Sequence, residues 1–160
     1  MRKVFLVTGF NNWGKTTLLS NLFETKTFHK KIPQCYGKHQ FLVMPQSNDD
    51  LHQDRYEKEF LDRLQKFEKI NGKAKYIASA FCPTKEPNNN SIEILHNLFK
   101  GDKIEMLLLE SKWCGNAKLI IPEITRLYSG ERNVTIHSIT SKSSVGKLSK
   151  VKSIFTGALR

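Results

Sequence analysis

Four residues near the start of the chain have the types and the spacing to hold a phosphate group. Residues 9–16 read Gly-Phe-Asn-Asn-Trp-Gly-Lys-Thr, so Gly9 is followed at a set interval by Gly14, Lys15 and Thr16. Glycines let the backbone curl so that several N–H groups point at one anion. A lysine ammonium can reach the outer phosphates of a nucleotide, and a threonine hydroxyl can ligate the Mg²⁺ that bridges them. This segment, called the glycine loop below, is a predicted phosphate site.

The sequence on both sides of the glycine loop fits that prediction. Residues 4–8 are β-branched and aromatic and predict a buried strand, whereas residues 16–23 place leucines at helical spacing. A helix that begins at the loop directs the positive end of its dipole at the same anion. A strand, a glycine loop and a helix in this order are the context that the motif needs.

In this context the glycine loop resembles the G-x-x-x-x-G-K-[ST] motif of the P-loop NTPase superfamily, closely over the loop and loosely over the rest. The resemblance implies ATP or GTP as ligand, Mg²⁺ as cofactor, and hydrolysis or phosphoryl transfer as activity. It assigns nucleotide binding to Gly9, Asn11, Asn12, Trp13, Gly14, Lys15, Thr16 and Thr17. Lys15 is also expected to be catalytic, and Thr16 to bind the metal. Trp13 either packs beneath the loop or stands beside the nucleotide.

Two groups of carboxylates are candidates for the acid that such chemistry requires. Glu110 ends the apolar run 106–109 and resembles the Walker B acid of the superfamily, although the usual residue there is Asp. In that role Glu110 is catalytic and binds the metal. Asp49 follows another predicted strand together with Asp50. This pair either binds Mg²⁺ through water or accepts a proton from a substrate hydroxyl, or it provides the acids that favour a helix N-terminus.

The segments expected near the base favour ATP over GTP. Lys112 stands where GTP-binding relatives carry an Asn-Lys-x-Asp motif, but the Asn and the Asp are absent. Ser141 and Lys142 resemble a later Ser-Ala-Lys motif, so we expect the stretch 140–147 to lie near the base. Without the carboxylate, selectivity for guanine has no source.

Hydrophobic periodicity predicts the elements that must position these residues. Apolar runs predict strands at 4–8, 41–44, 75–82, 104–110 and 133–140, and helical spacing predicts helices at 16–23, 54–70, 91–101, 122–130 and 145–159. The alternation implies about five mostly parallel strands with helices on both faces, which by resemblance is the three-layer α/β fold of P-loop NTPases. Segments 25–37 and 83–90 are predicted connections.

Length and composition set broad bounds. A chain of 160 residues predicts a single nucleotide-binding domain over 1–160. No apolar run approaches the about 18 residues of a membrane span, and the first residues lack the pattern of a signal peptide. Cys35, Cys82 and Cys114 are widely separated, which predicts reduced thiols and a cytoplasmic protein.

The charge distribution suggests a further partner. The formal net charge is +11, of which residues 1–31 supply +5, residues 32–131 zero and residues 132–160 +6. If the first and last helices pack together, these charges form one basic face that attracts a polyanion such as nucleic acid. The alternative function is then a nucleotide-dependent regulatory or nucleic-acid-associated module that uses its basic N- and C-terminal segments.

Two other functions use the same loop. A nucleotide or small-molecule kinase would also need arginines on a mobile lid, and the six arginines of this chain are scattered. A sulfotransferase-like relative would bind the phosphate or sulfate of another ligand. The sequence therefore favours an enzyme that hydrolyses nucleoside triphosphates.

Overall fold

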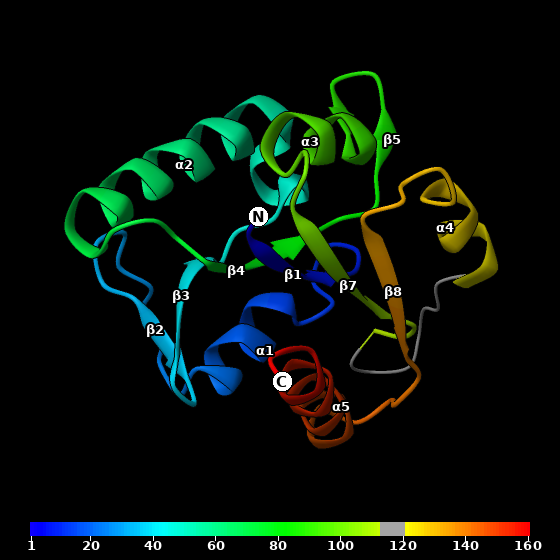
Figure 1. Ribbon diagram of the computed structural model, residues 1–160. Helices are drawn as coiled ribbons and strands as arrows, with labels where there is room; N and C mark the ends of the chain where they lie inside the picture. Colours follow the sequence, from blue (N-terminus) through cyan, green and yellow to red (C-terminus); the bar gives the residue numbers. More distant parts are fainter. Residues whose placement is uncertain (113–120) are drawn as a thin grey trace.

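The central feature of the structure is a six-stranded, mostly parallel sheet. The computed structural model describes residues 1–112 and 121–160. The sheet order is β2-β3-β4-β1-β7-β8, in which only the edge strand β2 is antiparallel (Figure 1). The strands are β1 (Lys3–Thr8), β2 (Gln34–Tyr36), β3 (His39–Met44), β4 (Tyr76–Phe81), β7 (Lys103–Leu109) and β8 (Val134–Ile139). The glycine loop follows β1, so the loop leaves the middle of the sheet.

Helices cover both faces of this sheet and create two apolar cores. Helices α2 (Asn48–Asn71) and α3 (Ser91–Leu98) lie on one face, and α1 (Lys15–Leu22) and α5 (Ser144–Ala158) lie on the other (Figure 1). Helix α4 (Ile121–Leu127) precedes β8. Strand β1 shows why both faces are covered: Val4 and Leu6 enter the first core, and Phe5 and Val7 enter the second. Continuous apolar runs are typical of parallel strands buried on both sides.

Aromatic rings join the elements around the glycine loop. The ring of Phe155 on α5 stacks on Phe5 of β1 with centroids 4.1 Å apart, and on Phe41 of β3 at 5.7 Å. Phe23, at the end of α1, contacts the same cluster, 5.4 Å from Phe41. These buried rings link the first helix to the last, as the charge argument assumed.

The structure confirms the five predicted strands and five predicted helices, and it corrects two predicted connections. Segment 25–37 contains the short edge strand β2, and segment 83–90 forms a hairpin of β5 (Lys85–Glu86) and β6 (Asn89–Asn90). Both additions are too short to show a hydrophobic period. Among the described residues, no helix is long and apolar enough to cross a membrane.

Helix α2 begins earlier than predicted because its first turn is separately capped. Ser47 and Asp50 form a reciprocal capping box, and His52 then adopts a left-handed φ of 60° that kinks the helix. The regular part therefore begins near residue 54, where the amphipathic period starts. The acids at this N-terminus do serve the helix, as one of the two interpretations of Asp49 and Asp50 held.

A buried asparagine fastens the first turn of α2 to the end of β4. The two N–H groups of the Asn48 side-chain amide are shared among three acceptors, the carbonyl of Cys82, Thr84 Oγ1 and Asn89 Oδ1, each 3.0 Å from Nδ2. Its oxygen accepts the Cys82 N–H at 2.7 Å, and Asn89 Nδ2 returns a bond to the Asn48 carbonyl at 3.0 Å. Asn48 is fully buried. One side chain thus satisfies polar groups from three segments beside the glycine loop.

Asn48→Ala is expected to destabilise the fold by about 2–4 kcal/mol, because it leaves several buried polar groups without partners. Urea denaturation followed by circular dichroism measures the change. Asn97→Ala, which removes an exposed bond to Glu57, is the matched control and should cost less than about 0.5 kcal/mol. Equal losses in the two variants would contradict a structural role for the Asn48 network.

Candidate functional site

The glycine loop turns from β1 into α1 through two left-handed residues. Asn12 has a φ of 61° and Gly14 a φ of 80°. Gly14 is also the N-cap of α1 and supplies no side-chain cap, and the first turn contains no acid. The N–H groups at the start of α1 are therefore available to an anion, as the sequence predicted for the segment after Gly14.

Trp13 packs beneath the loop. Its side chain is 5 % exposed and belongs to the core on the α1 and α5 face. It also lies against Gly9, where an added Cβ would be 3.4 Å from the Trp13 side chain, and it meets the Phe10 ring edge-on at 5.7 Å. One side of Trp13 still lines the cavity described below. The structure thus supports packing beneath the loop, and a position beside a nucleotide stays a prediction.

Lys15 is a buried cation held against the loop. Its Nζ donates to the carbonyl of Gly9 at 2.7 Å and to that of Phe10 at 2.8 Å, and the residue is 6 % exposed. Desolvation lowers the pKa of Lys15, while the charges of Asp50 and Asp49 oppose the shift. A desolvated ammonium interacts more strongly with an incoming anion than a hydrated one does.

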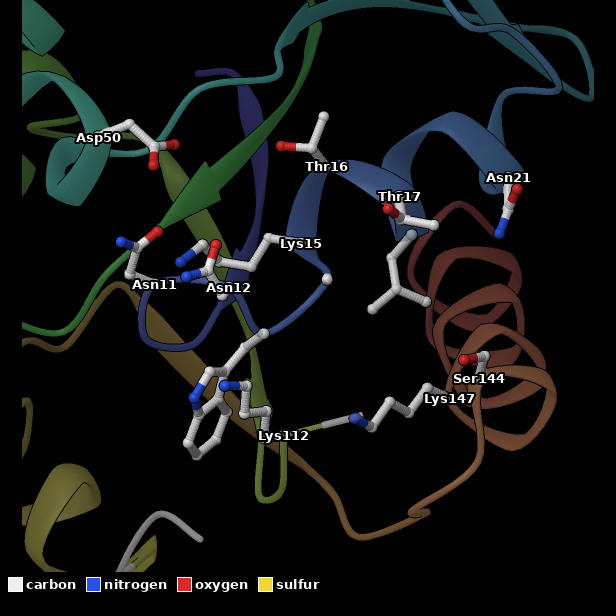
Figure 2. Close-up of a pocket in the computed structure, with 13 residues that line it drawn as sticks. Asn11, Asn12, Lys15, Thr16, Thr17, Asn21, Asp50, Lys112, Ser144 and Lys147 are labelled. Carbon is white, nitrogen blue, oxygen red and sulfur yellow. The ribbon is translucent and has the colours of Figure 1, made fainter. Parts of the chain in front are cut away.

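A cavity of about 760 Å³ opens in front of the loop (Figure 2). Seven of the eight predicted nucleotide-binding residues line it: Asn11, Asn12, Trp13, Gly14, Lys15, Thr16 and Thr17. The eighth, Gly9, packs against Trp13, and its carbonyl accepts a hydrogen bond from Lys15. The structure thus brings the loop residues around one space, with Lys15 in its wall.

Asp50 is the one carboxylate among the described residues that line the cavity. The Ser47 backbone N–H donates to Asp50 Oδ2 at 3.1 Å, and Asp50 Oδ1 takes no part in this bond. Thr16 Oγ1 donates to the Pro45 carbonyl at 2.8 Å, so its lone pairs remain for a cation. Figure 2 shows Asp50 and Thr16 on the same side of Lys15.

The two acids predicted to bind the metal, Glu110 and Asp49, do not line the cavity as Asp50 does. Glu110 follows β7 and its backbone N–H donates to the Ile139 carbonyl, but it does not line the cavity. Asp49 is half-buried, and its charge acts on both Lys15 and Cys82. Among the described residues, no cluster of three or more His, Cys, Asp or Glu side chains could hold a metal ion. Any metal here would therefore depend on the hydroxyl, one or two carboxylates and its ligand.

The opposite wall of the cavity is basic. Lys112, Ser144 and Lys147 line it, facing Lys15 across the space (Figure 2). Lys147 is buried at 2 % exposure, and its Nζ donates to the Ser111 carbonyl at 2.6 Å. This bond ties α5 to the end of β7.

The stretch 140–147 does reach the cavity, but through different residues from those predicted. Ser144 and Lys147 line the cavity, whereas Ser141 and Lys142 do not. Ser143 caps α5 by accepting the Gly146 N–H at 3.0 Å, which turns the first residues of the stretch away. Asn21, on the exposed side of α1, also lines the cavity. In the sequence, Asn21 and Lys147 look like ordinary polar residues of a helix, so no local signal identifies them.

Cys82 ends β4 beside the loop as a neutral thiol. Burial raises its pKa to about 12, with the charge of Asp49 adding to the effect and Lys15 opposing it. A thiol with so high a pKa is a poor nucleophile at neutral pH. Cys82 therefore packs at the strand end, and Cys114 lies outside the described residues.

Comparison with known proteins does not narrow the assignment. No family model matches the sequence, and no curated protein is similar enough to it to indicate a family. The geometry of the site is therefore the basis for the functional argument.

Gly14→Ala is expected to lower the free energy of unfolding by about 1–2 kcal/mol, because an L side chain is strained at a positive φ. The space around Gly14 is open, since an added Cβ has no neighbour within 4 Å. Gly130 is equally open without a left-handed φ, so Gly130→Ala is the control and should change stability by less than about 0.5 kcal/mol. Urea denaturation measures both, and equal effects would show that the conformation of Gly14 is not what requires glycine.

Proposed function

We propose that this chain is a P-loop NTPase that binds a magnesium–nucleoside triphosphate in the cavity before α1 and hydrolyses it. The observation that carries the proposal is the glycine loop. Its left-handed turn, the uncapped start of α1 and the buried Lys15 surround one cavity that is large enough for a ligand of nucleotide size. The strand–loop–helix order and the parallel sheet support it.

Lys15 provides the first step of the proposed mechanism. Its ammonium donates to the Gly9 and Phe10 carbonyls, and phosphate oxygens would compete for the same protons. A charged acceptor makes a stronger hydrogen bond than a neutral carbonyl. Lys15 would therefore turn toward the outer phosphates and stabilise the charge that develops as the phosphoryl group leaves.

Thr16 and Asp50 fit the role of metal ligands. A hydroxyl and a carboxylate are oxygen donors of the kind that Mg²⁺ takes, directly or through water. When bound, Mg²⁺ neutralises charge on the transferred phosphoryl group. Asp50, held by the capping box, would orient either a water on the metal or the attacking water. Asp49 is a second carboxylate, and its charge acts on Lys15. Glu110 stays an alternative acid, which would act on the metal through bridging water molecules.

The lining of the cavity favours ATP over GTP and hydrolysis over transfer. A guanine-binding site needs a carboxylate near the base. The described residues of the basic wall are Lys112, Ser144 and Lys147, none of which is an acid. A kinase needs arginines over the transferred phosphate. None of the arginines in the described residues lines the cavity, and Arg2 and Arg63 are paired with Asp102 and Glu59.

Titration calorimetry with non-hydrolysable analogues and Mg²⁺ tests binding. The chain should bind the ATP analogue with a dissociation constant between about 1 μM and 1 mM, more tightly than the GTP analogue. Lys15→Ala should abolish binding, because the ammonium is the main charge on the outer phosphates. Lys58→Ala, which removes an exposed lysine from α2, is the matched control.

Circular dichroism must show that Lys15→Ala stays folded. Failure of both analogues to bind would contradict the proposal. Tighter binding of the GTP analogue would contradict the preference for ATP.

Asp50→Asn is expected to lower the rate of phosphate release from ATP by about a hundredfold or more, because it removes the acid that orients water. The same change weakens the helix cap, so Ser47→Ala is the control: it breaks the capping box but keeps the carboxylate. Ser47→Ala should cost about 1 kcal/mol of stability with little change in rate. If Glu110→Gln reduces the rate more than Asp50→Asn does, Glu110 is the acid instead.

A further inference from the structure

A second cavity lies at the opposite edge of the sheet from the glycine loop. It has a volume of about 400 Å³ and is lined by Lys38, His39, Lys73, Lys75 and Tyr76, among others. A neighbouring depression of about 450 Å³ shares Lys73, Lys75 and Tyr76 with it and continues to Arg2, Lys3 and Lys103. The two together form a continuous strip, called the cationic groove below.

The topology of the sheet explains why these residues meet. The parallel strands β1, β3, β4 and β7 all begin at this edge. In their register Lys3 lies opposite both Tyr76 and Lys103. Lys38 belongs to the turn before β3, and Lys73 and Lys75 to the connection before β4. The six residues of β1 separate the groove from the glycine loop by about 20 Å.

Ion pairs offset only part of the charge of the groove, because Arg2 is paired with Asp102 and Lys103 with Glu105 at 3.7 Å. Lys38, Lys73 and Lys75 form no ion pair with any carboxylate in the described part of the chain, and all three are exposed. The acids nearby are already engaged. Asp102 is bound by Arg2 at 2.6 Å, Glu105 by His137 at 2.7 Å, and Glu68 accepts the Ala74 N–H at 3.0 Å.

This concentration of cations differs from what the sequence suggested. Four of the six basic residues of the groove, namely Lys38, Lys73, Lys75 and Lys103, come from the stretch 32–131, whose net charge is zero. Among the described residues, none of the acids of that stretch lines the groove, and many of them lie on α2. The fold thus gathers positive charge that no count along the chain reveals.

An aromatic ring lies within the groove. Tyr76 is half-buried, with the His39 ring against it at 4.9 Å and the Phe41 ring at 5.4 Å. Packing on two sides holds the Tyr76 ring in place, so a base that stacks there does not have to order it first. Cations along a groove together with a fixed aromatic ring are the two components of single-strand recognition.

We propose that the cationic groove binds single-stranded nucleic acid, with Lys38, Lys73 and Lys75 on the phosphates and Tyr76 against a base. A base can reach a recessed ring only when it is unpaired, so a duplex is disfavoured. A flat anionic membrane would contact the lysines but would gain nothing from Tyr76. The groove shares no residue with the glycine-loop cavity, so this binding does not depend on the proposed NTPase activity.

Fluorescence anisotropy with a labelled single-stranded oligonucleotide of mixed sequence tests the proposal. The logarithm of the binding constant should fall linearly with the logarithm of salt concentration. Replacing Lys38, Lys73 and Lys75 by Ala should reduce the magnitude of that slope by about 2, since each phosphate contact on a single strand contributes about 0.7. The matched control replaces Lys58, Lys85 and Lys150, which are exposed and line neither cavity of the groove.

Tyr76 supplies a second readout that net charge cannot mimic. Tyr76→Leu should weaken binding about tenfold without changing the salt slope, whereas Tyr76→Phe should retain the affinity of the unaltered chain. Lys15→Ala should bind the oligonucleotide normally. The proposal is overturned if the two triple variants lose affinity equally, if Tyr76→Leu has no effect, or if a duplex or vesicles of anionic lipid bind as well as the single strand.

Discussion

The central position of β1 is the constraint on which the site depends. This strand is paired with β4 on one side and β7 on the other, and its apolar side chains enter both cores. The backbone that leaves β1 at Thr8 therefore has a fixed position and direction. Gly9 continues that ladder by donating its N–H to the Phe81 carbonyl at 3.1 Å, so the loop is anchored before it turns. An anion site built from backbone N–H groups needs such anchoring, because it has no side chains with which to adjust.

The burial of Lys15 follows from the same constraint. The loop closes over this side chain, and Trp13 fills the space beneath Gly9, so the ammonium loses water and its pKa falls. Burying a cation is unfavourable unless polar partners or opposite charges compensate. The Gly9 and Phe10 carbonyls compensate in part, and Asp49 and Asp50 contribute at longer range. An anionic ligand would complete this compensation, which is why the geometry supports phosphate as the proposed ligand.

The regular elements and the glycine loop could be predicted because each depends on residues that are close together in the sequence. Apolar periods located the strands and helices, and the loop depends on eight consecutive residues. The acid was harder to predict, because it depends on which strand ends face the loop. Glu110 is predicted because it ends an apolar run, as the Walker B acid of the resembled superfamily does. The carboxylate that lines the cavity, Asp50, instead follows β3 in the first turn of α2. Lys147 was missed for a similar reason: only the packing of α5 shows that this residue of an amphipathic helix turns inward.

The two proposed sites lie at opposite ends of the same strands, and this arrangement bears on whether they can communicate. Coupling between sites requires an element with two alternative arrangements that both ligands bias. Beyond their first residues, β1, β4 and β7 are buried, paired in continuous register and packed on both faces, so they offer no second arrangement. Helix α2 is different, because its kink at His52 separates a first turn that carries Asp50 from a long body that carries Phe67, which lines the groove cavity. If nucleotide and nucleic acid influence each other, α2 is the element through which the effect would pass.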